Sequence, residues 1–69
     1  MSYFLVVVPS KEIQDALLAT LNNGENVVCT GTFGRPKDPP GSLCFVFQSN
    51  DLMAPLPMMG GGASSVMPL

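Results

Sequence analysis

The feature that most constrains this chain is a strand-like, a helix-like and a second strand-like segment that follow one another over residues 6–31 with almost no spare residue (VVVPSKEIQDALLATLNNGENVVCTG). Residues 3–8 are β-branched and aromatic without polar alternation, which is typical of a strand covered on both faces. Residues 26–32 are again strand-like, with Val27, Val28 and Cys29 as their apolar centre. Tight joins between strand, helix and strand favour a right-handed crossover and two neighbouring parallel strands. We therefore expect an α/β (α+β) fold based on a small β-α-β unit.

The segment between the two expected strands carries the signals of a helix. Pro9 ends the first strand, and Ser10 is placed to cap the helix that follows. The stop signal is the run Asn-Asn-Gly, in which Gly24 suits a left-handed position at the C-terminal end. One apolar stripe at helical spacing is predicted to cover the sheet, and its members are Ile13, Ala16, Leu17 and Leu21.

The remainder of the chain contains one more strand candidate. Residues 35–41 (RPKDPPG) have the composition of a turn or loop, and residues 42–48 (SLCFVFQ) form a third apolar strand. This strand either pairs beside the first two or covers the sheet face that the single helix leaves bare. Residues 53–69 show no periodicity, so we expect a mini-domain over residues 1–52 followed by a flexible tail rich in Pro, Gly and Met.

Charge and hydropathy exclude several classes of protein. Three basic residues stand against five acidic ones, for a net charge of −2, so the chain lacks the cationic surface that nucleic-acid binding requires. The longest apolar run, residues 4–8, is far below the roughly 20 residues that cross a bilayer. The start of the chain has no basic region before its apolar run, which argues against a secretory signal. We expect no membrane partner and a cytoplasmic location.

No residue pattern indicates catalysis. The chain has no His, so acid–base chemistry near neutral pH would need a carboxylate, Lys or Cys with a strongly shifted pKa. Glu12 and Asp15 lie on the polar side of the helix and are expected to form solvated surface. Cys29 and Cys44 lie in apolar runs, and we expect two reduced thiols buried in the core.

The glycine-rich stretches also lack the signals of a ligand site. Residues 31–37 (GTFGRPK) combine two glycines with basic side chains, but the Walker spacing is absent and Pro36 opposes the helix that would hold a phosphate. The three glycines at residues 60–62 follow no strand and indicate a linker. We assign no catalytic, cofactor-binding or metal-binding residue.

Residues 4–31 resemble the last strand–helix–strand unit of phosphoribosylformylglycinamidine cyclo-ligase, the AIR synthase of de novo purine biosynthesis. The match needs no gap, and its positions are residues 6–8, Pro9, Glu12, Ile13, Ala16, Leu17, Gly24, Glu25, Asn26, Val27 and Gly31. The resemblance implies a two-domain enzyme, usually a homodimer, that uses ATP and Mg²⁺. Its ATP-handling motifs lie upstream of the matching unit, so the resemblance assigns no catalytic residue here and leaves open whether this chain is an enzyme.

Two functional hypotheses follow. The resemblance implies a C-terminal fragment of AIR synthase that is inactive alone. The alternative is a small non-catalytic binding or structural module that docks on a larger protein assembly, or associates with itself, through the uncovered sheet face. The apolar fraction of 46% without any catalytic constellation supports the second hypothesis.

Overall fold

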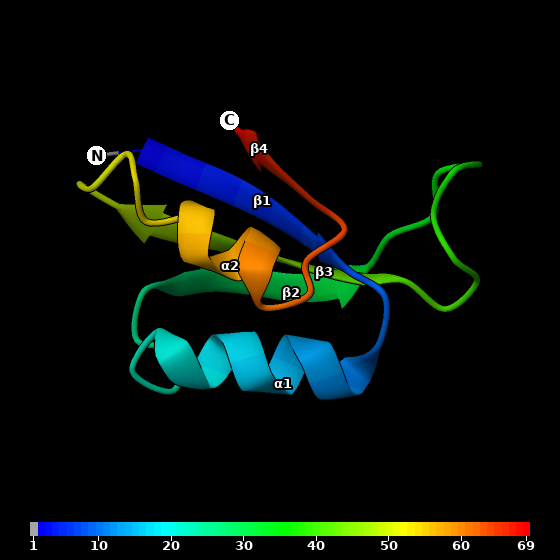
Figure 1. Ribbon diagram of the computed structural model, residues 1–69. Coiled ribbons are helices and arrows are strands. Elements are labelled where there is room, and N and C mark those ends of the chain that lie inside the picture. Colours follow the sequence, from blue (N-terminus) through cyan, green and yellow to red (C-terminus); the bar gives the residue numbers. More distant parts are fainter. Residues whose placement is uncertain (1) are drawn as a thin grey trace.

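The structure, a computed structural model, describes residues 2–69. Its elements in chain order are β1 (Ser2–Val8), α1 (Lys11–Thr20), β2 (Val27–Thr32), β3 (Leu43–Ser49), α2 (Leu56–Gly60) and β4 (Ser65–Pro68). The four strands form one sheet in which all neighbours are antiparallel (Figure 1). The expected α+β class is confirmed.

The order of the strands differs from the expected one. The sheet runs β2-β3-β1-β4, so that β1 and β2 point the same way but are separated by β3. The prediction that these two strands are neighbours is wrong, and the third strand pairs beside the first instead of covering a bare face. The apolar sequence of β3 (LCFVFQS) suits the centre of a sheet better than that of β2, which contains two threonines and a glycine. The unit β1-α1-β2 has β3 between its two strands, and the unit β3-α2-β4 has β1 between its two strands. This is the split β-α-β arrangement.

The structure also corrects the expectation of a flexible tail over residues 53–69. This segment forms α2 and β4, and β4 pairs with β1 from Phe4 opposite Pro68 to Val7 opposite Ser65. The Leu69 amide donates to the Tyr3 carbonyl at 2.9 Å just beyond that ladder. The end of the chain is therefore an edge strand of the same sheet.

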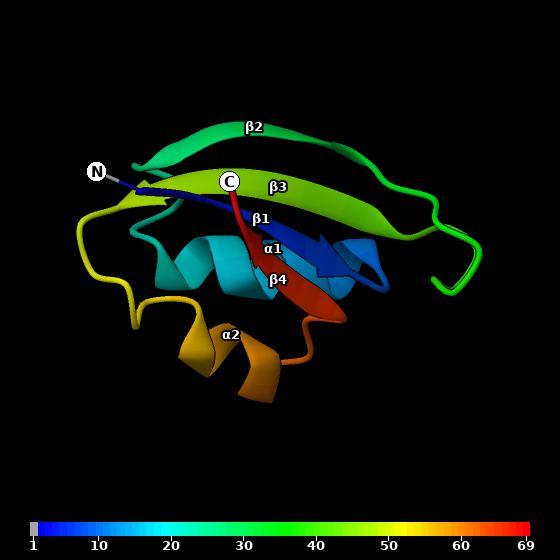
Figure 2. The ribbon, with the colours of Figure 1, turned by 90° about the horizontal axis from the view of Figure 1, so that it is seen from above.

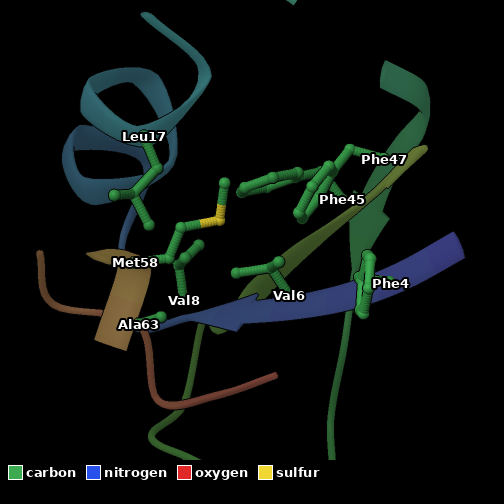
Figure 3. Close-up of a cluster of buried hydrophobic side chains, with 8 residues drawn as sticks. All are labelled: Phe4, Val6, Val8, Leu17, Phe45, Phe47, Met58 and Ala63. Carbon is green, nitrogen blue, oxygen red and sulfur yellow. The ribbon is translucent and has the colours of Figure 1, made fainter. Parts of the chain in front are cut away.

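The core lies between one face of the sheet and both helices. Figure 3 shows alternate side chains of β1 and β3 pointing toward Leu17 of α1 and Met58 of α2. The buried members of this cluster are Phe4, Val6, Val8, Leu17, Phe45, Phe47, Met58 and Ala63. The prediction that a single helix covers the sheet is thus incomplete, because α2 packs on the same sheet face as α1. The two helices also approach each other closely, since a Cβ added at Gly61 would lie 2.8 Å from Cδ2 of Leu17.

Helix α1 begins where the sequence indicates. The Ser10 hydroxyl accepts a hydrogen bond from the Ile13 amide at 3.2 Å, which satisfies one of the free donors of the first turn. The chain leaves the helix through three residues with positive φ, the last of which is Gly24 at +87°. The predicted cap and stop signals are both present.

The buried face of α1 is rotated from the predicted stripe. Ile13, Leu17 and Leu21 pack on the core, but Ala16 is exposed. The buried position is instead occupied by Gln14, whose side-chain amide donates to the backbone carbonyl of Cys44 at 3.0 Å. This hydrogen bond lets a polar side chain be buried, because its donor finds a partner in β3.

Candidate interaction surfaces

The charged side chains do not gather into a catalytic cluster. On α1, Lys11 pairs with Asp15 at 2.7 Å on the solvent side, and Glu12 is also exposed. Within residues 2–69 no group of three or more His, Cys, Asp or Glu side chains could hold a metal ion. The exposed pair on α1 has the character of ordinary solvated helix surface.

Arg35, in the loop between β2 and β3, is held by several partners. Its guanidinium donates to both carboxylate oxygens of Asp38, at 2.9 and 3.0 Å, and to the Ser65 hydroxyl at 2.9 Å. It also lies 5.0 Å from the centre of the Phe33 ring, a cation–π distance. The hydrogen bond from Arg35 lowers the pKa of Asp38, and the same bond raises the pKa of Arg35. The loop is therefore tied to β4, and this guanidinium is engaged by protein groups and not presented to an anion.

The two cysteines are free, but they are not buried in the core as predicted. Cys29 is exposed and Cys44 is half-buried. They lie opposite Val46 and Gly31, respectively, on neighbouring strands and on the face of the sheet away from the helices. Partial burial, and then the nearby Cys29, raise the pKa of the Cys44 thiol. A raised pKa keeps a thiol protonated at neutral pH and makes it a poor nucleophile.

The sheet face opposite the helices is only partly bare. Among residues 2–69 no helix lies on this face, and Figure 2 shows both helices on the other side. Leu5 and Val46 are half-buried there, and Tyr3 is exposed. Val7 is fully buried between its strand neighbours at the end where Arg35 crosses to β4. The loop around Arg35, which is tied to β4 by the hydrogen bond to Ser65, thus lies at one end of this face and leaves the Tyr3 end accessible.

The most exposed apolar surface lies elsewhere, at the C-terminal end. Residues 52–69 contain no charged side chain. Most of the large apolar side chains that are exposed come from this segment, and we call them the C-terminal apolar surface: Leu52, Met53, Leu56, Met59 and Leu69. A groove of about 450 Å³ between α2 and β4 adjoins it. The groove is lined by Phe4, Leu52, Pro55, Leu56, Met59, Ser64, Ser65, Val66 and Pro68.

The sequence favours a flexible tail over a methionine contact surface in this segment, because residues 53–69 show no periodicity. The structure gives the methionines distinct positions: Met58 is in the core, Met53 and Met59 are exposed, and Met67 belongs to β4. The sequence signal that could have indicated a surface is the absence of charge, since a solvated tail usually carries charged side chains.

Comparisons of the chain with known protein families, with curated proteins and with solved structures find no match. In the part of the chain that the structure describes, no helix has the length and apolar character needed to cross a membrane.

Proposed function

We propose that this chain is a small non-catalytic binding module that docks on a larger protein assembly. The observation that supports this proposal is the C-terminal apolar surface, which presents large Leu and Met side chains to solvent beside a groove. Three of these side chains, Leu52, Leu56 and Met59, line the groove together, and exposed apolar clusters mark interaction sites in soluble proteins. Met side chains are flexible and polarizable, which suits them to pack against a partner.

The groove supplies the shape that such docking needs. Its walls come from α2 on one side and from β4 with Phe4 of β1 on the other. Both walls are anchored, because Met58 fixes α2 to the core and β4 is hydrogen-bonded to β1. A rigid apolar groove lowers the entropic cost of binding. We propose a second contact with the partner on the helix-free sheet face, at its Tyr3 end, which the loop around Arg35 does not reach.

The test compares two substitutions at equally exposed sites. Leu56 is 59% exposed in the C-terminal apolar surface, and Val28 is 58% exposed on β2, away from it. The tagged chain is expressed in its source cells and its native complexes are separated by size. We expect Leu56→Lys to release the chain from the assembly and Val28→Lys to leave it bound. Equal retention of both folded variants in the assembly would contradict docking through this surface.

The second proposal is the one that the resemblance supplies, a C-terminal fragment of AIR synthase that is inactive alone. It is favoured by the formation of β1, α1 and β2 over residues 4–31, to which the resemblance applies. The described residues offer no metal-ligating cluster for Mg²⁺, so in this proposal ATP and Mg²⁺ are held by an upstream portion. Ring closure of formylglycinamidine ribonucleotide by that portion only after addition of this chain would support it. The same activity with and without the chain would contradict it.

A further inference from the structure

Two cysteine side chains lie near each other on the helix-free face of the sheet. Cys29 of β2 is opposite Val46 of β3. Cys44 of β3 is opposite Gly31 of β2, two residues further along each strand, so the two cysteines are diagonal neighbours on the same face. Figure 2 shows these two strands side by side, with both helices on the other side of the sheet. Since Cys29 is exposed and Cys44 is half-buried, the pair is open to solvent.

The spacing of this pair is too wide for a disulfide in the observed sheet. Diagonal neighbours of an antiparallel pair have Cα atoms about 7–8 Å apart. The Cα atoms of a disulfide are usually about 4.4–6.8 Å apart, so a direct bond would require the strands to move. Metal–thiolate bonds are about 2.3 Å long in zinc sites, so two sulfurs on opposite sides of such an ion would lie about 4.6 Å apart. The diagonal spacing therefore suits a bridging ion better than a direct bond.

The position opposite Cys44 leaves room for an ion. Gly31 has no side chain, and a Cβ added there would lie 3.9 Å from Sγ of Cys44. The space beside this sulfur is therefore not filled by a side chain of β2. The Cys44 thiol donates to the Thr32 carbonyl at 3.7 Å, and a thiol is a weak donor. Little free energy is therefore lost when this sulfur turns toward Cys29.

The lack of further ligands decides which kind of ion fits. Structural zinc sites have four ligands. Among residues 2–69 no third His, Cys, Asp or Glu side chain joins the two thiols in a metal-binding group. The flanking side chains are apolar, with Val7 opposite Cys44 and Val46 opposite Cys29. Thiolates select soft ions such as Cu(I), whereas hard ions prefer oxygen ligands. A soft monovalent ion can be held by two sulfurs alone.

We propose that Cys29 and Cys44 together bind one soft monovalent metal ion of the Cu(I) type between β2 and β3. Both thiols release their protons to solvent and two sulfur–metal bonds form, so the two thiolates and the cation leave a single negative charge. The lack of His, which argues against a zinc site, does not argue against this one. The site is independent of the proposed docking function, because it lies on the opposite side of the sheet from α2.

The test is titration of the full reduced chain with Cu(I), without oxygen and in competition with a colorimetric chelator. We expect one ion per chain and a monomer in sedimentation. Cys29→Ser and Cys44→Ser should each weaken binding by more than the roughly 10–100-fold that loss of an outer-sphere partner costs, because each removes a sulfur–metal bond. Met67→Leu is the matched control. It removes a sulfur from β4, at the other edge of the sheet, and should leave the affinity unchanged.

Four results would overturn the proposal. Unchanged Cu(I) affinity in folded Cys29→Ser would show that the ion is bound elsewhere. Two chains on one ion would show that the exposed Cys29 bridges copies instead of pairing with Cys44. Equally tight binding of Zn²⁺ would require ligands beyond the two thiols. Ready formation of a disulfide within one chain on addition of diamide would contradict the spacing. Because Cys29 is exposed, its Ser variant keeps the test valid even if Cys44→Ser fails to fold.

Discussion

Replacing Met58 by Ala tests whether the C-terminal segment stabilises the fold. Met58 is 3% exposed and is the side chain by which α2 enters the core, between Leu17 of α1 and the strands (Figure 3). Truncation of a buried Met to Ala costs about 2–5 kcal/mol, from lost transfer free energy and the cavity left behind. A chain of 69 residues has a total free energy of unfolding of about 3–10 kcal/mol. The substitution should therefore remove a large share of the stability.

Met59 provides a matched control one residue away. It is the same residue type in the same helix, but it is 49% exposed. Met59→Ala should change the free energy of unfolding by only about 0.5 kcal/mol, as is usual for surface positions. Urea unfolding followed by circular dichroism measures both variants. In thermal unfolding Met58→Ala should lower Tm by at least about 8 °C, since each kcal/mol shifts Tm by about 4–8 °C in a domain of this size.

The reasoning would be refuted if Met58→Ala and Met59→Ala had equal effects. Equal and small effects would mean that α2 does not pack on the sheet. Equal and large effects would mean that Met59 is buried as well, and the C-terminal apolar surface would then not be exposed in solution.

Three further predictions concern the rest of the chain. Ser10→Ala should lower the free energy of unfolding by about 1 kcal/mol in urea titrations, because it removes the cap of α1; an unchanged midpoint would show that the cap does not contribute. Because Arg35 lowers the pKa of Asp38 below its ordinary 3.8, the stabilisation from this carboxylate is present above that value and is lost as the pH falls through the lowered value. Asp38→Asn should therefore flatten the acid side of a stability–pH curve, and an identical curve would contradict the ion pair. Iodoacetamide at neutral pH should modify Cys29 before Cys44, because Cys29 is exposed and the pKa of Cys44 is raised; mass spectrometry showing equal rates would argue against these positions.

The first part of the fold was predictable because its signals are local. The apolar runs mark β1, β2 and β3 to within one or two residues of their observed ends, and Ser10 and Gly24 delimit the helical segment through their own conformational preferences. The strand order was not predictable in the same way. It depends on competition between β2 and β3 for the place beside β1, which is decided by long-range packing.

The C-terminal segment and its surface were missed for a related reason. Residues 53–69 have no periodicity, and a helix as short as α2 is not stable by itself in water. The segment is ordered by non-local contacts, through Met58 in the core and through β4 on β1. The exposure of Leu56 and Met59 follows from that docking, so a sequence reading that assigned a tail could not place the groove.

Amide hydrogen exchange on the full chain tests the central claim most directly, which is that residues 53–69 are an integral part of the sheet and core. The Ser64 and Leu69 amides donate to the carbonyls of Val7 and Tyr3 in the structure. We predict that these amides are protected and lose their protection together with the β1 amides in a single cooperative transition. Exchange of Ser64 and Leu69 at the rate of an unfolded chain, while β1 and β3 stay protected, would contradict the account.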